Sequence, residues 1–145
     1  MLAIGCDHGG YELKQEIMRY FDESGIAYKD FGCYSTESVD YPDIAVTVCE
    51  SVVNGECEKG ILVCGTGIGM SIAANKIKGI RAALLSDTYS AQMTAEHNNS
   101  NVIALGGRVI STELAIDIIK AYLSAEFQGG RHLARLEKIK LLEEK

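Results

Sequence analysis

The sequence predicts an α/β fold in which a parallel β-sheet is covered by helices on both faces. Short runs of branched apolar residues alternate along the chain with longer segments whose apolar residues recur every three or four positions. The short runs are almost wholly apolar, which is typical of strands buried on both faces. Because parallel strands need a crossover between them, this alternation predicts helices above and below one sheet.

Length and composition favour one globular domain. The 145 residues are 47% hydrophobic and 23% charged, and the net charge is -6 at pH 7. A chain of this length suits a single hydrophobic core, so we interpret residues 1–145 as one domain. The negative charge argues against nucleic acid or an anionic membrane as the main partner. No apolar run approaches the ~20 residues of a membrane span, and the first residues lead into a strand rather than a signal peptide.

The five cysteines indicate reduced thiols. Their number is odd and none forms a CxxC pair. Free thiols in a reducing cytosol explain this pattern better than disulfides or a zinc site, so we expect a cytoplasmic protein without a bound metal. Four of them are interpreted as small core or surface residues: Cys6, Cys33, Cys49 and Cys57.

The first half of the chain predicts three strands and two helices. The strands are residues 2–5, 26–31 and 61–63, of which the second contains several polar residues. The helix after the first strand ends at Gly25, a residue suited to the left-handed position that closes helices. The next helix has Pro42 in its first turn, where the missing proline N–H costs nothing.

The second half predicts two more strands, residues 81–85 and 102–105, and four helices, the first of which begins at about Met70. One helix begins after Ser86-Asp87-Thr88, which supplies capping side chains, and ends near His97. A strongly apolar helix runs from its Ser111 cap to Leu123. With a last helix from about Arg131, the whole reads as a three-layer α/β/α, Rossmann-like domain with a five-stranded parallel sheet and an extra C-terminal helix.

Polar residues follow three of the predicted strands. Asp7 and His8 come after the first strand, residues 64–69 after the third and residues 106–108 after the fifth. The carboxyl ends of parallel strands lie at one edge of a sheet, where ligands bind in folds of this class. We therefore expect these three segments to meet in one site.

Three glycines mark the central segment as a loop for an anion. Gly65, Gly67 and Gly69 separate a buried strand from a predicted helix, and glycine allows the backbone to turn tightly and approach a ligand. A strand, a glycine loop and a helix N-terminus together attract negative charge. The spacing differs from GxGxxG and lacks Gly-Lys-Ser/Thr, which disfavours a dinucleotide or a nucleoside triphosphate and leaves a phosphate or an enolate.

Cys64 stands at the start of this loop. A cysteine at a strand end is often only a small core residue. Here the predicted helix N-terminus and several backbone N–H groups face the sulfur, which favours its thiolate form. We therefore predict a reactive thiol at Cys64.

The histidines admit two interpretations. Asp7 and His8 fit a helix cap with a surface histidine, and His97 fits the end of a helix with Asn98 as its left-handed cap. The chain has only three histidines, and two of them come beside the predicted site loops. That placement favours a role in chemistry.

Arg131 and Arg135 are four residues apart, so they share one face of the last helix. Such a pair commonly belongs to the solvent-exposed face of a helix. Two guanidinium groups with fixed charge are also what a phosphate requires. The spacing leaves both interpretations open.

From residue 2 to about residue 137 the chain resembles the ribose-5-phosphate isomerase B family, which includes the galactose-6-phosphate isomerase subunits. The motifs that carry the resemblance are Gly5-Cys6-Asp7-His8-Gly9-Gly10, Asp40-Tyr41-Pro42, residues 64–76, Gly79-Ile80-Arg81-Ala82, His97-Asn98-Asn99, Gly107-Arg108 and Gly129-Gly130-Arg131-His132. The resemblance implies an isomerase that interconverts an aldose phosphate and its ketose without a metal or an organic cofactor.

The resemblance also implies residue roles. Cys64 matches the catalytic base, His97 the acid that helps to open the sugar ring, and Thr66 a hydroxyl that assists it. The positions matched to substrate binding, including the phosphate, are Asp7, His8, Tyr41, Gly65, Gly67, Ile68, Gly69, Ser71, Asn98, Arg108, Arg131 and Arg135. One branch of the family uses a glutamate as base where this chain has Met70, so the chain resembles the cysteine branch.

The resemblance further implies a homodimer, or a dimer of dimers, with residues 128–145 contacting a neighbouring subunit. It also implies a pocket between two subunits, into which the C-terminal arginines reach. Ribose 5-phosphate of the pentose phosphate pathway is the expected substrate, with activity on allose 6-phosphate as a possible addition. A hexose 6-phosphate as main substrate is the alternative. A cysteine hydrolase using Cys64 and His97, or a sugar-phosphate sensor without turnover, is a further alternative that the residues leave open.

Overall fold

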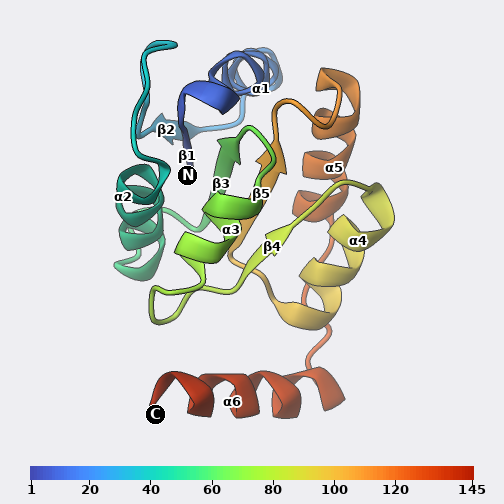
Figure 1. Cartoon of the computed structure of the whole chain (residues 1–145). Coiled ribbons are helices and arrows are strands. Elements are labelled where there is room, and N and C mark those ends of the chain that lie inside the picture. Colours follow the sequence, from blue (N-terminus) through green and yellow to red (C-terminus); the bar gives the residue numbers. More distant parts are fainter.

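The computed structural model, which describes residues 1–145, has a five-stranded, wholly parallel sheet at its centre (Figure 1). The strand order is β2-β1-β3-β5-β4, and every neighbouring pair is parallel. The strands are β1 Leu2–Cys6, β2 Tyr28–Asp30, β3 Lys59–Cys64, β4 Ala82–Leu84 and β5 Val102–Gly106. The predicted fold class is confirmed.

Six helices and two short helical turns connect and flank the strands. They are η1 His8–Gly10, α1 Tyr11–Ser24, α2 Tyr41–Val53, α3 Ile68–Ala74, α4 Thr88–Met93, the π-helical turn η2 Thr94–Asn98, α5 Thr112–Ser124 and α6 Arg131–Glu143. The predicted helix boundaries are confirmed at Gly25, which is left-handed after α1, and at Asp87 and Ser111, whose side chains cap α4 and α5. No helix of the chain is long and apolar enough to cross a membrane.

Two separate cores cover the two faces of the sheet. Side chains of α1, α4 and α5 pack on one face, and side chains of α2 and α3 pack on the other. Successive strand residues alternate between these cores: in β3, Ile61 and Val63 face α1 and α5, whereas Leu62 and Cys64 face α2 and α3. Cys64 therefore points toward the side of the sheet that carries α2 and α3.

Three local predictions need correction. The strands at the sheet edges, β2 and β4, are three residues each and shorter than predicted, because an edge strand has a partner on one side only. The helix predicted to end near His97 does end there, at Asn98, but its last five residues form the wider π-helical turn η2 instead of continuing α4. The left-handed residue after it is Asn99, with φ 46, rather than Asn98.

The C-terminal helix α6 stands apart from the three layers (Figure 1). Its main contact within the chain is with η2. A cleft of about 630 Å³ lies between α6 and the body of the protein, lined on the helix side by residues that include Leu136 and Ile139. Much of the apolar surface of α6 is exposed, including Leu133, Leu141 and Leu142. A helix with exposed apolar side chains and few intrachain contacts is typical of a segment that packs against another chain.

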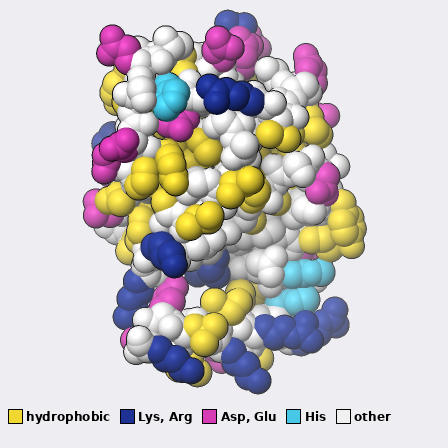
Figure 2. Space-filling view, in the orientation of Figure 1, with side chains coloured by type: hydrophobic (Ala, Val, Ile, Leu, Met, Phe, Trp, Pro, Cys, Tyr) yellow, Lys and Arg dark blue, Asp and Glu magenta, His cyan; other side chains and the backbone are white.

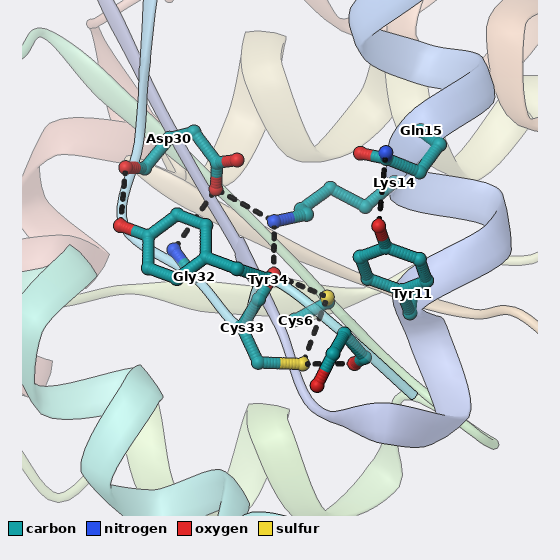
Figure 3. Close-up of polar contacts among 9 residues, drawn as sticks. Cys6, Tyr11, Lys14, Gln15, Asp30, Gly32, Cys33 and Tyr34 are labelled. Atoms are coloured by element: carbon teal, nitrogen blue, oxygen red, sulfur yellow. Dashed lines mark hydrogen bonds and ion pairs between the residues drawn. The ribbon is translucent and has the colours of Figure 1, made fainter. Parts of the chain in front are cut away.

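Lys14 ties α1 to the segment that follows β2 (Figure 3). Its side chain is fully buried, and Nζ donates to the Asp30 carboxylate and to the Cys33 carbonyl oxygen at 2.6 Å each. The Cys33 N–H donates in turn to the carbonyl oxygen of Cys6 at 2.7 Å. The segment is thereby held beside the end of β1, directly before the predicted site residue Asp7.

Replacing Lys14 with alanine should destabilise the protein by about 3 kcal/mol, because the change leaves the partly buried Asp30 carboxylate without its counter-charge. Urea unfolding measures the loss. Lys138→Ala, a change at an exposed position of α6, is the matched control and should cost less than about 0.5 kcal/mol. An equal, small effect of both changes would contradict a structural role for the buried ion pair.

Candidate active site

The three loops at the carboxyl ends of β1, β3 and β5 are joined by backbone hydrogen bonds. The Gly107 N–H donates to the Cys64 carbonyl oxygen at 2.8 Å, and the Arg108 N–H donates to that of Gly65 at 3.0 Å. On the other side, the Asp7 N–H donates to the Val63 carbonyl oxygen at 3.1 Å. The expectation that these segments meet at one edge of the sheet is confirmed.

Close backbone approach explains why glycines occupy this junction. A Cβ atom on Gly10 would collide with the carbonyl group of Val63, and one on Gly107 would lie 2.9 Å from the carbonyl oxygen of Gly9. Real Cβ atoms do not approach backbone atoms so closely, so any side chain here would force the loops apart.

Cys64 is the last residue of β3 and is 5% exposed. The Gly67 N–H donates to its Sγ at 3.1 Å, and Gly67 has φ 80, the left-handed conformation that glycine tolerates best. The loop therefore turns its backbone donor toward the sulfur. The α3 helix that follows is only seven residues long, and the Gly67 amide directly before it is the backbone donor bonded to the sulfur.

The other cysteines behave as core residues. All five are free and buried. Burial raises the pKa of the Cys6 and Cys49 thiols to about 12, which keeps them protonated at neutral pH. Cys6 lies with its sulfur 3.8 Å from that of Cys33 (Figure 3). The interpretation of these residues as small core side chains fits the structure.

Asp7 and His8 are both fixed by backbone donors. The Asp7 Oδ1 atom accepts from the N–H groups of Gly9 and Gly10 at 2.8 and 3.2 Å, so this carboxylate caps the turn η1. The His8 Nδ1 atom accepts from the Val39 N–H at 3.3 Å. This bond places the proton of a neutral His8 on Nε2, where it can donate to a ligand oxygen.

Further predicted site residues border the glycine loop. The Arg108 Nη1 atom lies 3.2 Å from where a Cβ of Gly65 would be, and the Tyr41 ring lies within 2.6 Å of the equivalent point on Gly69. Both glycines thus leave room for a side chain that lies across the loop.

The hydroxyl groups of the loop form local bonds. The Thr66 Oγ1 atom accepts from the Ile68 N–H at 3.2 Å, and the Ser71 hydroxyl donates to the Ile68 carbonyl oxygen at 2.8 Å. Thr66 and Ile68 are exposed, whereas Ser71 is half-buried. The Thr66 side chain is thus oriented by the loop and open to a ligand.

His97 does not lie beside these loops, and that prediction needs correction. It belongs to η2, which precedes β5 and therefore sits at the amino end of the strand. The register pairs Val102 with Gly60 and Gly106 with Cys64. At ~3.3 Å per residue, Gly60 and Cys64 are about 13 Å apart along β3, so His97 and the thiol are at opposite edges of the sheet.

A second group of predicted site residues surrounds His97 at this far edge. Arg131 and Arg135 are exposed on α6, and Asn98 lines the cleft between that helix and the body. Figure 2 shows histidine side chains at two separated places, one near the upper end of the molecule and one beside α6. Within one chain, the predicted site residues are therefore divided into two groups.

His132 belongs to the second group and was given no role from the sequence. Its ring stacks on that of His97, with the centroids 4.2 Å apart and the planes 13° from parallel. Burial and the positive charges of His97, Arg131 and Arg135 lower its pKa, so it is neutral at pH 7. The only feature of the sequence that could have pointed to His132 is its position between the predicted phosphate-binding residues Arg131 and Arg135.

Comparison with known proteins places this geometry in a family. The family model for Ribose/Galactose Isomerase matches residues 2–139. The chain belongs to the ribose/galactose isomerase family. Membership of this family makes the protein an isomerase, and the match over residues 2–139 includes both groups of residues.

Members with different substrate names are equally similar to this chain. The ribose-5-phosphate isomerase B of Escherichia coli is 49% identical, with 99% of this chain and 97% of that protein covered. The D-erythrulose-4-phosphate isomerase of Pectobacterium atrosepticum is also 49% identical, with 95% and 91% covered. The solved ribose-5-phosphate isomerase B of Clostridium thermocellum has a TM-score of 0.97 at 52% identity and covers 99% of this chain and 97% of its own.

Proposed function

We propose that this isomerase interconverts ribose 5-phosphate and ribulose 5-phosphate through an enediolate, with Cys64 as the base. The observation that carries the proposal is the hydrogen bond of 3.1 Å from the Gly67 N–H to Cys64 Sγ, which lies where the three site loops meet. This hydrogen bond shows that the proposed base and a backbone donor are adjacent. The relatives named for ribose 5-phosphate support the choice of substrate.

The proposed reaction moves one proton between neighbouring carbons. The Cys64 thiolate removes the proton from C2 of the open-chain aldose and returns it to C1, while the hydroxyl proton passes from O2 to O1. The negative charge that develops on oxygen needs donors aimed at it, each worth about 3–4 kcal/mol. The N–H groups of residues 65–69 are the candidates, and they make a metal or an organic cofactor unnecessary in this mechanism.

The remaining residues bind the sugar and its phosphate in this proposal. His97 and Thr66 assist ring opening, and Asp7 contacts sugar hydroxyls. The phosphate is held by Arg131 and Arg135 together with His8 and Arg108, and Asn98 contacts the sugar. Anchoring the phosphate fixes the reacting carbon near the sulfur, which converts binding energy into rate.

We propose that a second copy of the chain completes this site, in line with the family resemblance. Cys64 and Arg108 lie at one edge of the sheet and His97 with the α6 arginines at the other. The glycine-loop side also exposes apolar residues: Ile68 is 50%, Ile72 58% and Leu84 44% exposed. Such a patch next to a site suits an interface between copies (Figure 2). We propose a homodimer in which each pocket takes one group of residues from each chain.

A smaller or larger sugar phosphate is the second candidate. The relative that acts on D-erythrulose 4-phosphate is as similar as the one that acts on ribose 5-phosphate, so overall identity does not separate the two. Hexose 6-phosphates of the allose and galactose type are the larger candidate substrates. The distance between base and phosphate anchor decides among them.

Cys64→Ala should lower isomerase activity by at least roughly 100-fold, because the base is lost. The measurements are turnover of ribose 5-phosphate and solvent deuterium incorporation at C1 or C2, with calorimetry to show that the sugar phosphate still binds. Cys49→Ala, which removes another buried thiol on the same side of the sheet, is the control. Normal turnover by Cys64→Ala would end the assignment of the base.

Mixing two inactive variants should restore activity if each pocket is shared between two chains. One variant is Cys64→Ala and the other carries Arg131→Ala with Arg135→Ala. After subunit exchange half of the dimers are mixed, and each mixed dimer has one intact pocket of two, which predicts about a quarter of wild-type activity. If all site residues acted within one chain, the mixture would stay as inactive as its parts.

A panel of phosphorylated aldoses and ketoses with four, five and six carbons tests the substrate. We expect the highest kcat/KM for the five-carbon pair, and a large loss of both affinity and turnover for ribose without phosphate. A higher kcat/KM for erythrulose 4-phosphate or a hexose 6-phosphate would replace the first candidate with the second.

A further inference from the structure

His132 differs from the rest of α6 in its burial. It is 7% exposed, whereas most residues of the helix are exposed. Its ring lies face to face with that of His97, at 4.2 Å between centroids. The stack is therefore the point at which α6 is joined to the turn η2.

The segment that leads into α6 adds a second connection to the same turn. The Gln128 N–H donates to the Glu96 carbonyl oxygen at 3.0 Å, and its Nε2 donates to the Glu96 carboxylate at 2.6 Å. Glu96 directly precedes His97. These bonds hold the backbone of η2, a π-helical turn of a type often found at functional sites, and the stack then holds the His97 ring.

We propose that His132 is a positioning residue that fixes the His97 imidazole relative to the Arg131 and Arg135 guanidinium groups. The inference rests on the proposed function, in which His97 opens the sugar ring and the arginines hold the phosphate. Arg131 precedes His132 directly, and Arg135 is about one helical turn beyond it, so all three move with α6.

The consequence of the stack is a fixed distance between His97, the proposed acid, and the arginines that are proposed to hold the phosphate. The far end of α6 is bound to the body, because the Gly79 N–H donates to the Glu143 carboxylate at 3.3 Å and Lys78 pairs with Glu144 at 3.1 Å. Without the stack, the beginning of α6 would be held to η2 only through the segment at Gln128, and the His97 ring would lose its contact with the helix. A shift of about 1 Å between groups that bind two ends of one substrate costs up to roughly 100-fold in rate. A rigid unit avoids that loss.

The charges around the stack suit a neutral His132. Burial lowers the pKa of His132, and its neighbours His97 on η2 and Arg131 and Arg135 on α6 lower it further. The neighbouring Glu96 carboxylate is bound by Gln128. A neutral ring can stack on His97 in either protonation state, whereas a second imidazolium would repel a protonated His97.

Two variants of His132 separate stacking from simple folding defects. His132→Ala removes the ring, and His132→Phe keeps an aromatic ring that can stack but cannot donate or accept a proton. Lys138→Ala on the exposed part of α6 is the control. Each full-length protein is assayed for kcat and KM with ribose 5-phosphate, and the His97 ring is followed by NMR over pH 5–8 in the absence of substrate.

We expect His132→Ala to lower kcat by roughly 10- to 100-fold, with His132→Phe recovering most of it. The His97 ring resonances should move in His132→Ala and stay near their wild-type positions after aromatic-ring effects are allowed for in His132→Phe. Normal kcat in His132→Ala, or a phenylalanine variant as impaired as the alanine variant, would overturn the proposal.

The NMR arm distinguishes this inference from the proposed function. If the wild-type protein does not isomerise ribose 5-phosphate, the substrate proposal fails while the position of the His97 ring is still measured. An unperturbed His97 ring in His132→Ala would reject the positioning role, whatever the substrate.

Discussion

The site depends on the close backbone packing of three loops at the carboxyl edge of the sheet. Hydrogen bonds from Gly107 to the Cys64 carbonyl and from Asp7 to the Val63 carbonyl extend the strand pairing beyond the sheet. They leave no room for side chains at Gly10 or Gly107. The same packing fixes the end of β3, and so it determines where the Cys64 sulfur lies and which amide reaches it. Without that junction, nothing would hold the Gly67 amide against the sulfur.

Much of the fold is encoded locally and could be predicted from sequence. Gly25, Asp87 and Ser111 end or cap helices through their own backbone and side-chain chemistry, without help from distant residues. Strands that are buried on both faces can be recognised by their almost wholly apolar composition. Their carboxyl ends then show at which edge of the sheet the candidate site lies. The edge strands were predicted too long, because each has a single neighbouring strand and its polar residues give no periodic signal.

The candidate site was predictable only in part. Because His97 comes directly before the last strand, chain order implies that it lies at the edge of the sheet where the strands begin. Its position close to predicted site loops in the sequence suggested the opposite edge. The stack of His97 on His132 joins residues from separate elements, and no local pattern encodes the direction in which α6 leaves the body. Long-range placement of this kind requires coordinates.

The separation of the two groups of residues has a genetic consequence. A chain damaged at the Cys64 edge still carries an intact α6, and a chain damaged on α6 still carries an intact glycine loop. If each pocket is shared between two chains, as proposed above, each copy could lose a different edge after gene duplication, and the pair would survive as an obligate heteromer with half as many pockets. The placement of one helix away from the sheet therefore gives this fold a route from one gene to two interdependent ones.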